Sequence, residues 1–543
     1  MKRESYLRTA ILCATVFSVV ALGVFAGRHQ MVADAAPKFQ GVLTYHNDNM
    51  RTGFNSAETT LTLKNVNSTT FGKLFVISTD GLVDAQPLYV PNLIVGGSSH
   101  NVLFVASEHG TVYAFDADDG AKLWHVTTLG TGETTSDDRG CKQVTPEIGV
   151  TSTPVIDLAA GDHGTIYLVA MSKDSSGIYH HRLHALDVTT GVEEFGGPVE
   201  IAAKYPGTGD GSQDGFVIFD APRYKERAAL ILSKHVVYTA WSSHCDHRPY
   251  TGWIIGYDQK TLAQKSVLNV TPNGNEGSIW GAGGGLAAEA NGNLYFLDAN
   301  GTFDTTLDAN GFPVNGDYGN AVVKLSTKKG ALTVSDYFNM YNTVAESDRD
   351  EDLGSGGALV LPNIKDSSGK IHQLVVGAGK DANIYLLDRL NMGKFNPNNN
   401  NQIYQQISGQ LNGSVFSTPA YAAGTLYYGA VGDRIKAFTF DANAKLNTTY
   451  QSRTSKSFGY PGATPSLSGM GKKNLILWAT ENGSQAVLHA YDARNLAVEL
   501  YNSTQAGSRD QFGTGNKYIT PTIANGKVYV GTQTGVGVFG LLP

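Results

Sequence analysis

The sequence predicts an all-β protein, an eight-bladed β-propeller of four-stranded antiparallel blades closed by strands from both termini. Three observations support this prediction. Glycine is frequent, at 63 of 543 residues, and only 16% of residues are charged, against ~25% charged in an average soluble protein. A short sequence unit recurs through the chain. Each unit contains apolar runs of strand length that are separated by small polar turns.

The repeats divide the chain into eight units. Most units begin with a short strand after a proline and continue through a β-rich strand, a polar turn and a strand that ends near an aspartate. The units begin near Pro87, Pro154, Arg227, Trp280, Gly354, Pro419, Pro465 and Pro521. Seven blades remain an alternative, because the region 221–265 is the least regular. The last unit lacks a fourth strand, which Phe71–Ser78 could supply to close the ring.

Residues 1–35 are typical of a secretory signal peptide. The first eight residues carry three basic side chains, Thr9–Gly27 has no charge, and Ala33-Asp34-Ala35 offers a small-x-small cleavage pattern. The apolar stretch is also long enough for an uncleaved membrane anchor. We expect residues 36–543 to form a single exported domain, periplasmic or extracellular, with membrane contact only through an uncleaved N-terminal segment.

Composition excludes several function classes. The net charge is −7, whereas nucleic-acid-binding proteins normally carry a basic patch. Three cysteines are too few for a small disulfide scaffold. The glycine run at 281–285 precedes no phosphate-binding helix, so a nucleotide site is not expected. We therefore expect neither nucleic acid nor nucleotide as a ligand.

Strand order predicts which loops share a face of the propeller. When the strands of each blade are named A to D from the centre outward, all B–C turns and all D-to-A crossovers lie on one face, because neighbouring strands are antiparallel. This face holds the longest polar loops of the chain, including 130–150, 300–318 and 347–352. We expect ligands to bind on this face.

The segment AFDADDGAKLW resembles the blade motif of the quinoprotein dehydrogenases and related pyrroloquinoline-quinone (PQQ) repeat propellers. Ala114, Asp116, Gly120 and Trp124 match the motif residues that dock neighbouring blades in that family. Tyr45–Val66 is similar to the family's mature N-terminus. The resemblance covers nearly the whole mature chain and implies the propeller fold. Activity must be judged from the site, since non-enzymatic propellers share the motif.

The resemblance also implies a cofactor site, with PQQ in the central funnel stacked on a tryptophan beside a calcium ion. Trp280 is similar to that tryptophan, Lys380 to a cation that hydrogen-bonds the quinone, and Asp84 lies near an acidic residue that contacts the cofactor. Asn300 resembles a calcium ligand, and Asp352 resembles the catalytic base beside the metal. A hard cation needs oxygen ligands, and a carboxylate can accept an alcohol proton.

Two departures from the family pattern stand out. The family's calcium-ligating glutamate is expected near Ser176, where no glutamate occurs and Asp174 is offset by two positions. The family's two adjacent cysteines are replaced by Cys141 alone. No C-x-x-C-H motif is present, so we expect no attached haem and a separate electron acceptor if the protein is an enzyme.

The two cysteines outside the leader are expected to form a disulfide. Cys141 lies in the crossover into the second blade and Cys245 in the B–C turn of the third, so both belong to one face and to neighbouring blades. Two free thiols are the alternative. The surrounding run His244–His247 could bind zinc, although hydrogen bonding within the loop is the favoured interpretation.

Two classes of function remain open from the sequence. The first is an exported oxidoreductase that uses PQQ and calcium to oxidise an alcohol or sugar. The second is a non-catalytic propeller that binds a ligand, a polymer or a protein through the face with the long loops.

Overall fold

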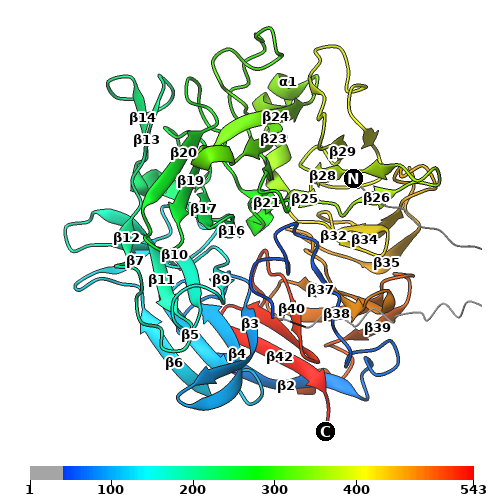
Figure 1. Ribbon diagram of the computed structural model, residues 1–543. Coiled ribbons are helices and arrows are strands. Elements are labelled where there is room, and N and C mark those ends of the chain that lie inside the picture. The colour runs from blue at the N-terminus through cyan, green and yellow to red at the C-terminus, as the bar shows by residue number, and fades with distance from the viewer. Residues whose placement is uncertain (1–38, 40) are drawn as a thin grey trace, which may run out of the picture. The chain divides into compact units, whose positions relative to one another are not determined.

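Eight small antiparallel sheets form the ring of a β-propeller in the computed structural model (Figure 1), which describes residues 39 and 41–543. The described residues belong to one compact unit. The predicted signal peptide lies outside the described residues. The eight-bladed fold is confirmed, and the least regular unit, the third, has a complete sheet of four strands.

The blades follow one another in chain order. The first four, from the innermost strand outward, are β3 (Leu88–Val95), β4 (Ser98–Ala106), β5 (Thr111–Asp116) and β6 (Lys122–Thr127); β9 (Val155–Asp157), β10 (Thr165–Lys173), β11 (Tyr179–Asp187) and β12 (Val199–Glu200); β16 (Ile231–Ser233), β17 (Val236–Ala240), β19 (Trp253–Asp258) and β20 (Gln264–Asn269); and β21 (Ala287–Ala288), β22 (Leu294–Leu297), β23 (Ala321–Ser326) and β24 (Thr333–Asn339).

The remaining four blades continue in the same way. They are β25 (Leu359–Val360), β28 (Leu374–Ala378), β29 (Ile384–Asp388) and β31 (Gln405–Ile407); β32 (Ala420–Ala422), β33 (Thr425–Tyr428), β34 (Arg434–Thr439) and β35 (Ser452–Ser457); β36 (Ser466–Met470), β37 (Lys473–Glu481), β38 (Val487–Asp492) and β39 (Glu499–Asn502); and β40 (Thr522–Ala524), β41 (Lys527–Thr532), β42 (Gly535–Leu541) and β2 (Phe71–Ser78).

Strands from both ends of the chain close the ring, as predicted. β2 pairs antiparallel with β42, from Phe71 opposite Leu541 to Ser78 opposite Gly535; the two strands lie side by side in Figure 1 in blue and red. This pairing completes the eighth blade and leaves no gap between the first and last repeats.

Further short strands, one short helix and several 3₁₀ turns lie in the loops between these strands. They are β1 (Phe54–Asn55), β7 (Thr134–Asp137), β8 (Glu147–Ile148), β13 (Lys204–Pro206), β14 (Phe216–Ile218), β15 (Tyr224–Lys225), β18 (Ser242–Ser243), β26 (Ile364–Lys365), β27 (Ile371–His372), β30 (Lys394–Phe395), the helix α1 (Thr343–Asp348) and the 3₁₀ turns η1 (Ala221–Arg223), η2 (Gly281–Gly283), η3 (Lys328–Gly330), η4 (Leu353–Ser355) and η5 (Gly507–Asp510). None of the helices among the described residues has the length and apolar character needed to cross a bilayer.

Neighbouring blades dock through the residues of the repeated motif. The indole Nε1 of Trp124, on β6, donates a 3.1 Å hydrogen bond to the carbonyl of Val188 in the next blade. Gly191 has a φ of +71°, and a Cβ added there would meet Trp124 Cε3 at 2.8 Å. Only glycine allows this backbone to approach the indole so closely.

The segment 42–55 fills the centre of the ring and is called the plug below. It makes hydrogen bonds with the innermost strand, or the residue beside it, of every blade. For example, the backbone N–H groups of Ile156, Val360 and Tyr421 donate to carbonyls of the plug. The plug therefore ties all eight blades together, and most of it belongs to the segment Tyr45–Val66 that resembles the family's mature N-terminus.

The glycine run at 281–285 lies where the fourth blade approaches the plug. A Cβ at Gly284 would meet Thr418 Oγ1 at 2.4 Å and Tyr45 Cε1 at 3.1 Å. The Tyr45 hydroxyl in turn lies 3.4 Å from Thr418 Oγ1 and 3.3 Å from Thr520 Oγ1. The run thus permits close packing of backbone against the plug.

Candidate active site

A cavity of about 450 Å³ lies among the B–C turns and the crossovers that enter the innermost strands. Its lining combines aromatic, acidic and basic side chains from several blades. It includes four of the predicted site residues, Trp280, Asn300, Asp352 and Lys380. The face chosen from strand order therefore holds a cavity of the size that small-molecule sites usually have.

Two neighbouring blades supply these four residues. Trp280 lies in the crossover that precedes β21, and Asn300 follows β22 in the B–C turn of the same blade. Asp352 directly precedes η4 in the next crossover, and Lys380 follows β28. The backbone N–H of Lys380 donates a 2.9 Å hydrogen bond to the carbonyl of Asp352, which holds the crossover and the turn in register.

An ion-pair network occupies the acidic end of the cavity. Lys380 Nζ lies 2.6 Å from Asp352 Oδ1 and 2.6 Å from Asp350 Oδ1. Asn300 Nδ2 donates a 2.8 Å hydrogen bond to Asp350 Oδ1. The Asn300 Oδ1 atom is buried without a hydrogen-bond partner, so it remains available to a ligand.

Burial sets the protonation of the central carboxyl group. The Asp352 side chain is 4% exposed, and its burial raises its pKa to about 6, against the opposing effect of the Lys380 ammonium. Burial disfavours the charged form of Lys380, but Asp352 and Asp350 raise its pKa above the ordinary value. A carboxylate with a pKa near 6 is well suited to accept protons at neutral pH.

The structure places a further acidic residue at the cavity, Asp246. It lies in the B–C turn of the third blade, and its Oδ1 accepts a 2.6 Å hydrogen bond from the Tyr250 hydroxyl. Ser176, where the family pattern placed a glutamate, is instead exposed in a turn of the second blade. The sequence analysis noted the His244–His247 turn as rich in potential ligands but did not single out Asp246 as a site residue.

Asp84 does not line the cavity. Its Oδ1 accepts a 3.0 Å hydrogen bond from Asn516 Nδ2. Burial and the adjacent charge of Asp84 raise the pKa of Glu108 well above its usual range. Asp84 and Glu108 therefore form a buried acid pair outside the cavity lining.

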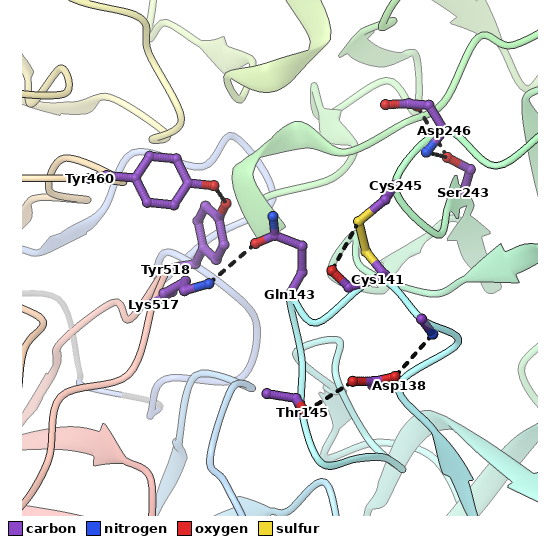
Figure 2. The surroundings of a disulfide bond; sticks show 11 residues. Asp138, Cys141, Gln143, Thr145, Ser243, Cys245, Asp246, Tyr460, Lys517 and Tyr518 are labelled. Atoms are coloured by element: carbon purple, nitrogen blue, oxygen red, sulfur yellow. Dashed lines mark hydrogen bonds between the residues drawn. A yellow bond between two sulfur atoms is a disulfide. The ribbon is translucent and has the colours of Figure 1, made fainter.

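Cys141 and Cys245 are joined by a disulfide whose Cα atoms lie 5.5 Å apart. Figure 2 shows that the segment after Cys141 brings Gln143 close to Lys517 and Tyr518, which precede the eighth blade. Gln143 Oε1 accepts a 3.4 Å hydrogen bond from Lys517 Nζ. Cys245 and Gln143 both line the cavity, so the disulfide fixes part of its wall.

Aromatic rings form another part of the lining. The hydroxyl groups of Tyr460 and Tyr518 lie 2.5 Å apart (Figure 2), and the Tyr460 ring packs edge-on against Phe416. Together with Trp280 these rings offer flat apolar surfaces to a planar ligand.

The donor chemistry suits a hard cation but does not form a closed metal site. Within residues 39 and 41–543, no three His, Cys, Asp or Glu side chains are placed to hold a metal together. Asn300 and Asp352 nevertheless offer oxygen atoms, the ligands that calcium prefers. His244 Nε2 lies 2.9 Å from the carbonyl of Tyr224, a hydrogen bond within the protein of the kind favoured over zinc binding.

Solved structures with this fold include alcohol and methanol dehydrogenases. The chain is similar to quinohemoprotein alcohol dehydrogenase from Comamonas testosteroni, with a TM-score of 0.61 and 14% identity over 93% of this chain and 81% of that chain. It is also similar to a quinohemoprotein alcohol dehydrogenase from Pseudomonas putida HK5 (TM-score 0.58, 13% identity, 92% and 80% coverage). A europium-containing methanol dehydrogenase gives a TM-score of 0.59 at 13% identity, over 92% of this chain and 98% of that chain.

These similarities and the sheet order establish the fold of this chain, an eight-bladed β-propeller. They agree with the resemblance of the blade motif. No family model matches the sequence, and no curated protein sequence matches it either. What the chain does must therefore be argued from its own cavity.

Proposed function

We propose that this protein is an exported oxidoreductase that binds PQQ in the central cavity and oxidises a hydroxyl group of an alcohol or sugar. The observation that carries the proposal is the convergence of Trp280, Asn300, Asp352 and Lys380 on one cavity of about 450 Å³. These residues supply an aromatic face, an open oxygen donor, a general base and a cation within one site.

The cavity fits a planar quinone in size and in chemistry. Trp280 and Phe416 offer ring faces, and Lys380 offers an ammonium group to a quinone oxygen. When bound, the quinone supplies the acceptor for two electrons, and a calcium ion held by Asn300 and Asp352 would polarise a quinone carbonyl.

The chain's own residues would bind the substrate and move its proton. Asp352 accepts the hydroxyl proton, and Lys380 at 2.6 Å stabilises the carboxylate before the transfer. The wall held by the Cys141–Cys245 disulfide limits the access of water to this end of the cavity. Electrons leave to a separate acceptor.

Export is part of the same proposal. The leader-like residues 1–35 support a periplasmic or extracellular location. A disulfide such as Cys141–Cys245 is stable in those oxidising compartments.

Reconstitution tests the function directly. The purified chain without residues 1–35, incubated with PQQ and calcium chloride, should reduce an artificial electron-accepting dye when ethanol or glucose is added. Omission of PQQ should abolish the reduction. Tight PQQ binding without dye reduction across alcohols and sugars would overturn the catalytic proposal and favour a non-catalytic binding propeller.

The pH dependence of the reaction should report Asp352. Because its pKa is raised to about 6, the base is protonated below that pH, and the rate should fall as pH decreases through about 6. Lys380 opposes this shift, so Lys380→Met should move the acidic limb of the kcat profile to higher pH. An acidic limb in Lys380→Met at the same pH as in the wild type, or at lower pH, would contradict the assignment.

A further inference from the structure

Two positive side chains in the cavity wall have no carboxylate partner. Lys225 ends β15, and Arg227 follows two residues later; both line the cavity. Lys225 is 2% exposed and Arg227 is 9% exposed. Among the described residues neither takes part in an ion pair, and Arg227 Nη2 is buried without a hydrogen-bond partner. Buried charges are normally paired, because leaving water without compensation is costly.

The nearby carboxyl groups do not supply the missing negative charge. Both carboxyl oxygens of Glu226 are buried without a partner, and burial raises its pKa well above the usual range, so the group is neutral. Burial and the neighbouring Asp84 also raise the pKa of Glu108 well above its usual range. The pKa of Lys225 is lowered to about 8, chiefly by burial and further by Arg227. Neither Glu226 nor Glu108 therefore compensates the two positive side chains with a full negative charge.

The backbone presents the two cations side by side. Residues 225 and 227 are two positions apart, so in an extended segment they face the same side with a spacing of about 6.5 Å. The intervening Glu226 is not in the cavity lining and instead borders a second, small pocket beside His181, which Lys225 also lines. An anion with two oxygen atoms can therefore contact both cations at once.

The Arg227 guanidinium is held in place before any ligand binds. Its Cζ lies 4.7 Å from the centre of the Tyr518 ring. On another side, a Cβ at Gly283 would meet Arg227 Nη1 at 2.6 Å, so the absence of a side chain there gives the guanidinium its space. A planar guanidinium fixed in this way suits bidentate binding of a carboxylate.

We infer that Lys225 and Arg227 form an anion subsite that binds a carboxylate of a small ligand in the cavity. Asp246, Asp350 and Asp352 line the same cavity and offer an anion no favourable contact, so the subsite also orients the ligand. Its carboxylate faces Lys225 and Arg227, and its uncharged end faces Asp352. The inference needs no redox chemistry and would hold if the proposed oxidoreductase function failed.

A first experiment tests the subsite with an inorganic anion, sulfate. We expect sodium sulfate at low millimolar concentration, where the general stabilisation of proteins by sulfate is negligible, to raise the Tm of the purified chain above its value in sodium chloride of equal ionic strength. Lys225→Met and Arg227→Met should lose this difference, whereas Lys370→Met, at an exposed site, should keep it. Without sulfate the two cavity variants should melt no lower than the wild type, because each removes an uncompensated buried charge. A lower Tm with an intact sulfate effect would show a structural role and overturn the inference.

A second experiment identifies the source of the carboxylate. PQQ is compared with its trimethyl ester, and lactate is compared with propane-1,2-diol, by calorimetric titration of the wild type and Lys225→Met. Loss of one charge-assisted hydrogen bond should weaken the carboxylated member of one pair by at least about tenfold and leave its neutral partner unchanged. Weaker binding of PQQ, but not of its trimethyl ester, to Lys225→Met assigns the subsite to the cofactor. Weaker binding of lactate, but not of propane-1,2-diol, assigns it to an acidic substrate. Unchanged affinity for both PQQ and lactate would overturn the inference.

Discussion

Asp352→Asn is expected to abolish measurable turnover while leaving PQQ binding largely intact. The asparagine has nearly the same shape but cannot accept the substrate proton at neutral pH. General-base catalysis typically contributes about 10²–10⁴-fold to the rate, so kcat should fall by that factor. The Lys380 ammonium, 2.6 Å from Asp352 in the wild type, keeps its ion pair with Asp350, which should preserve the local structure.

Steady-state dye reduction after reconstitution with PQQ measures this effect. Asp348→Asn serves as the matched control, because Asp348 is exposed at the end of α1 and does not line the cavity. Its kcat should stay within about twofold of the wild type. Equal rates for Asp352→Asn and Asp348→Asn would remove Asp352 from the mechanism.

Arg51→Met should cause the largest loss of stability. Arg51 is 0% exposed and joins the plug to two blades. Its guanidinium donates hydrogen bonds to the carbonyls of Leu286 at 2.9 Å and Leu230 at 3.2 Å, and to Thr44 Oγ1 and the carbonyl of Tyr45 within the plug. The substitution leaves these four acceptors without a donor. Each unpaired buried group costs about 1–3 kcal/mol, so the free energy of unfolding should fall by about 4 kcal/mol or more.

Urea unfolding compares this variant with Arg494→Met. The Arg494 side chain is 63% exposed and forms an ion pair with Asp492 on the surface, so its loss should change stability by at most about 0.5 kcal/mol. If Arg51→Met unfolded at the same urea concentration as Arg494→Met, the plug would not be a structural tie between the blades.

Much of the fold follows from local patterns. Runs such as Thr111–Asp116 alternate or concentrate apolar residues over strand length and end in a turn, and this pattern recurs often enough to number the blades. The closure by Phe71–Ser78 was predictable because the last unit lacked one strand. The contacts of the plug were not predictable, since hydrogen bonds such as Arg51 to Leu286 join residues far apart in the sequence and leave no periodic signal.

The repeated strand order also made part of the candidate site predictable. Strand order alone put Trp280, Asn300, Asp352 and Lys380 on one face, and the cavity brings them together. Lys225 belongs to the least regular region of the sequence, where a two-residue strand gives no recognisable pattern.

The sequence also could not show which side chains at suitable positions along the chain actually line the cavity. Asp84 lies at a suitable position along the chain, but it is buried outside the cavity lining beside Glu108. Whether an aspartate reaches a lumen depends on packing that strand order does not describe.

The central claim is that the cavity beside Trp280 binds PQQ, and calorimetric titration tests it most directly. We predict that PQQ binds the purified chain at one site per molecule in the presence of calcium. Trp280→Ala should abolish or strongly weaken this binding, whereas Tyr341→Ala, at an exposed position outside the cavity lining, should not change it. Absence of binding to the wild type, or equal affinity in Trp280→Ala, would contradict the account.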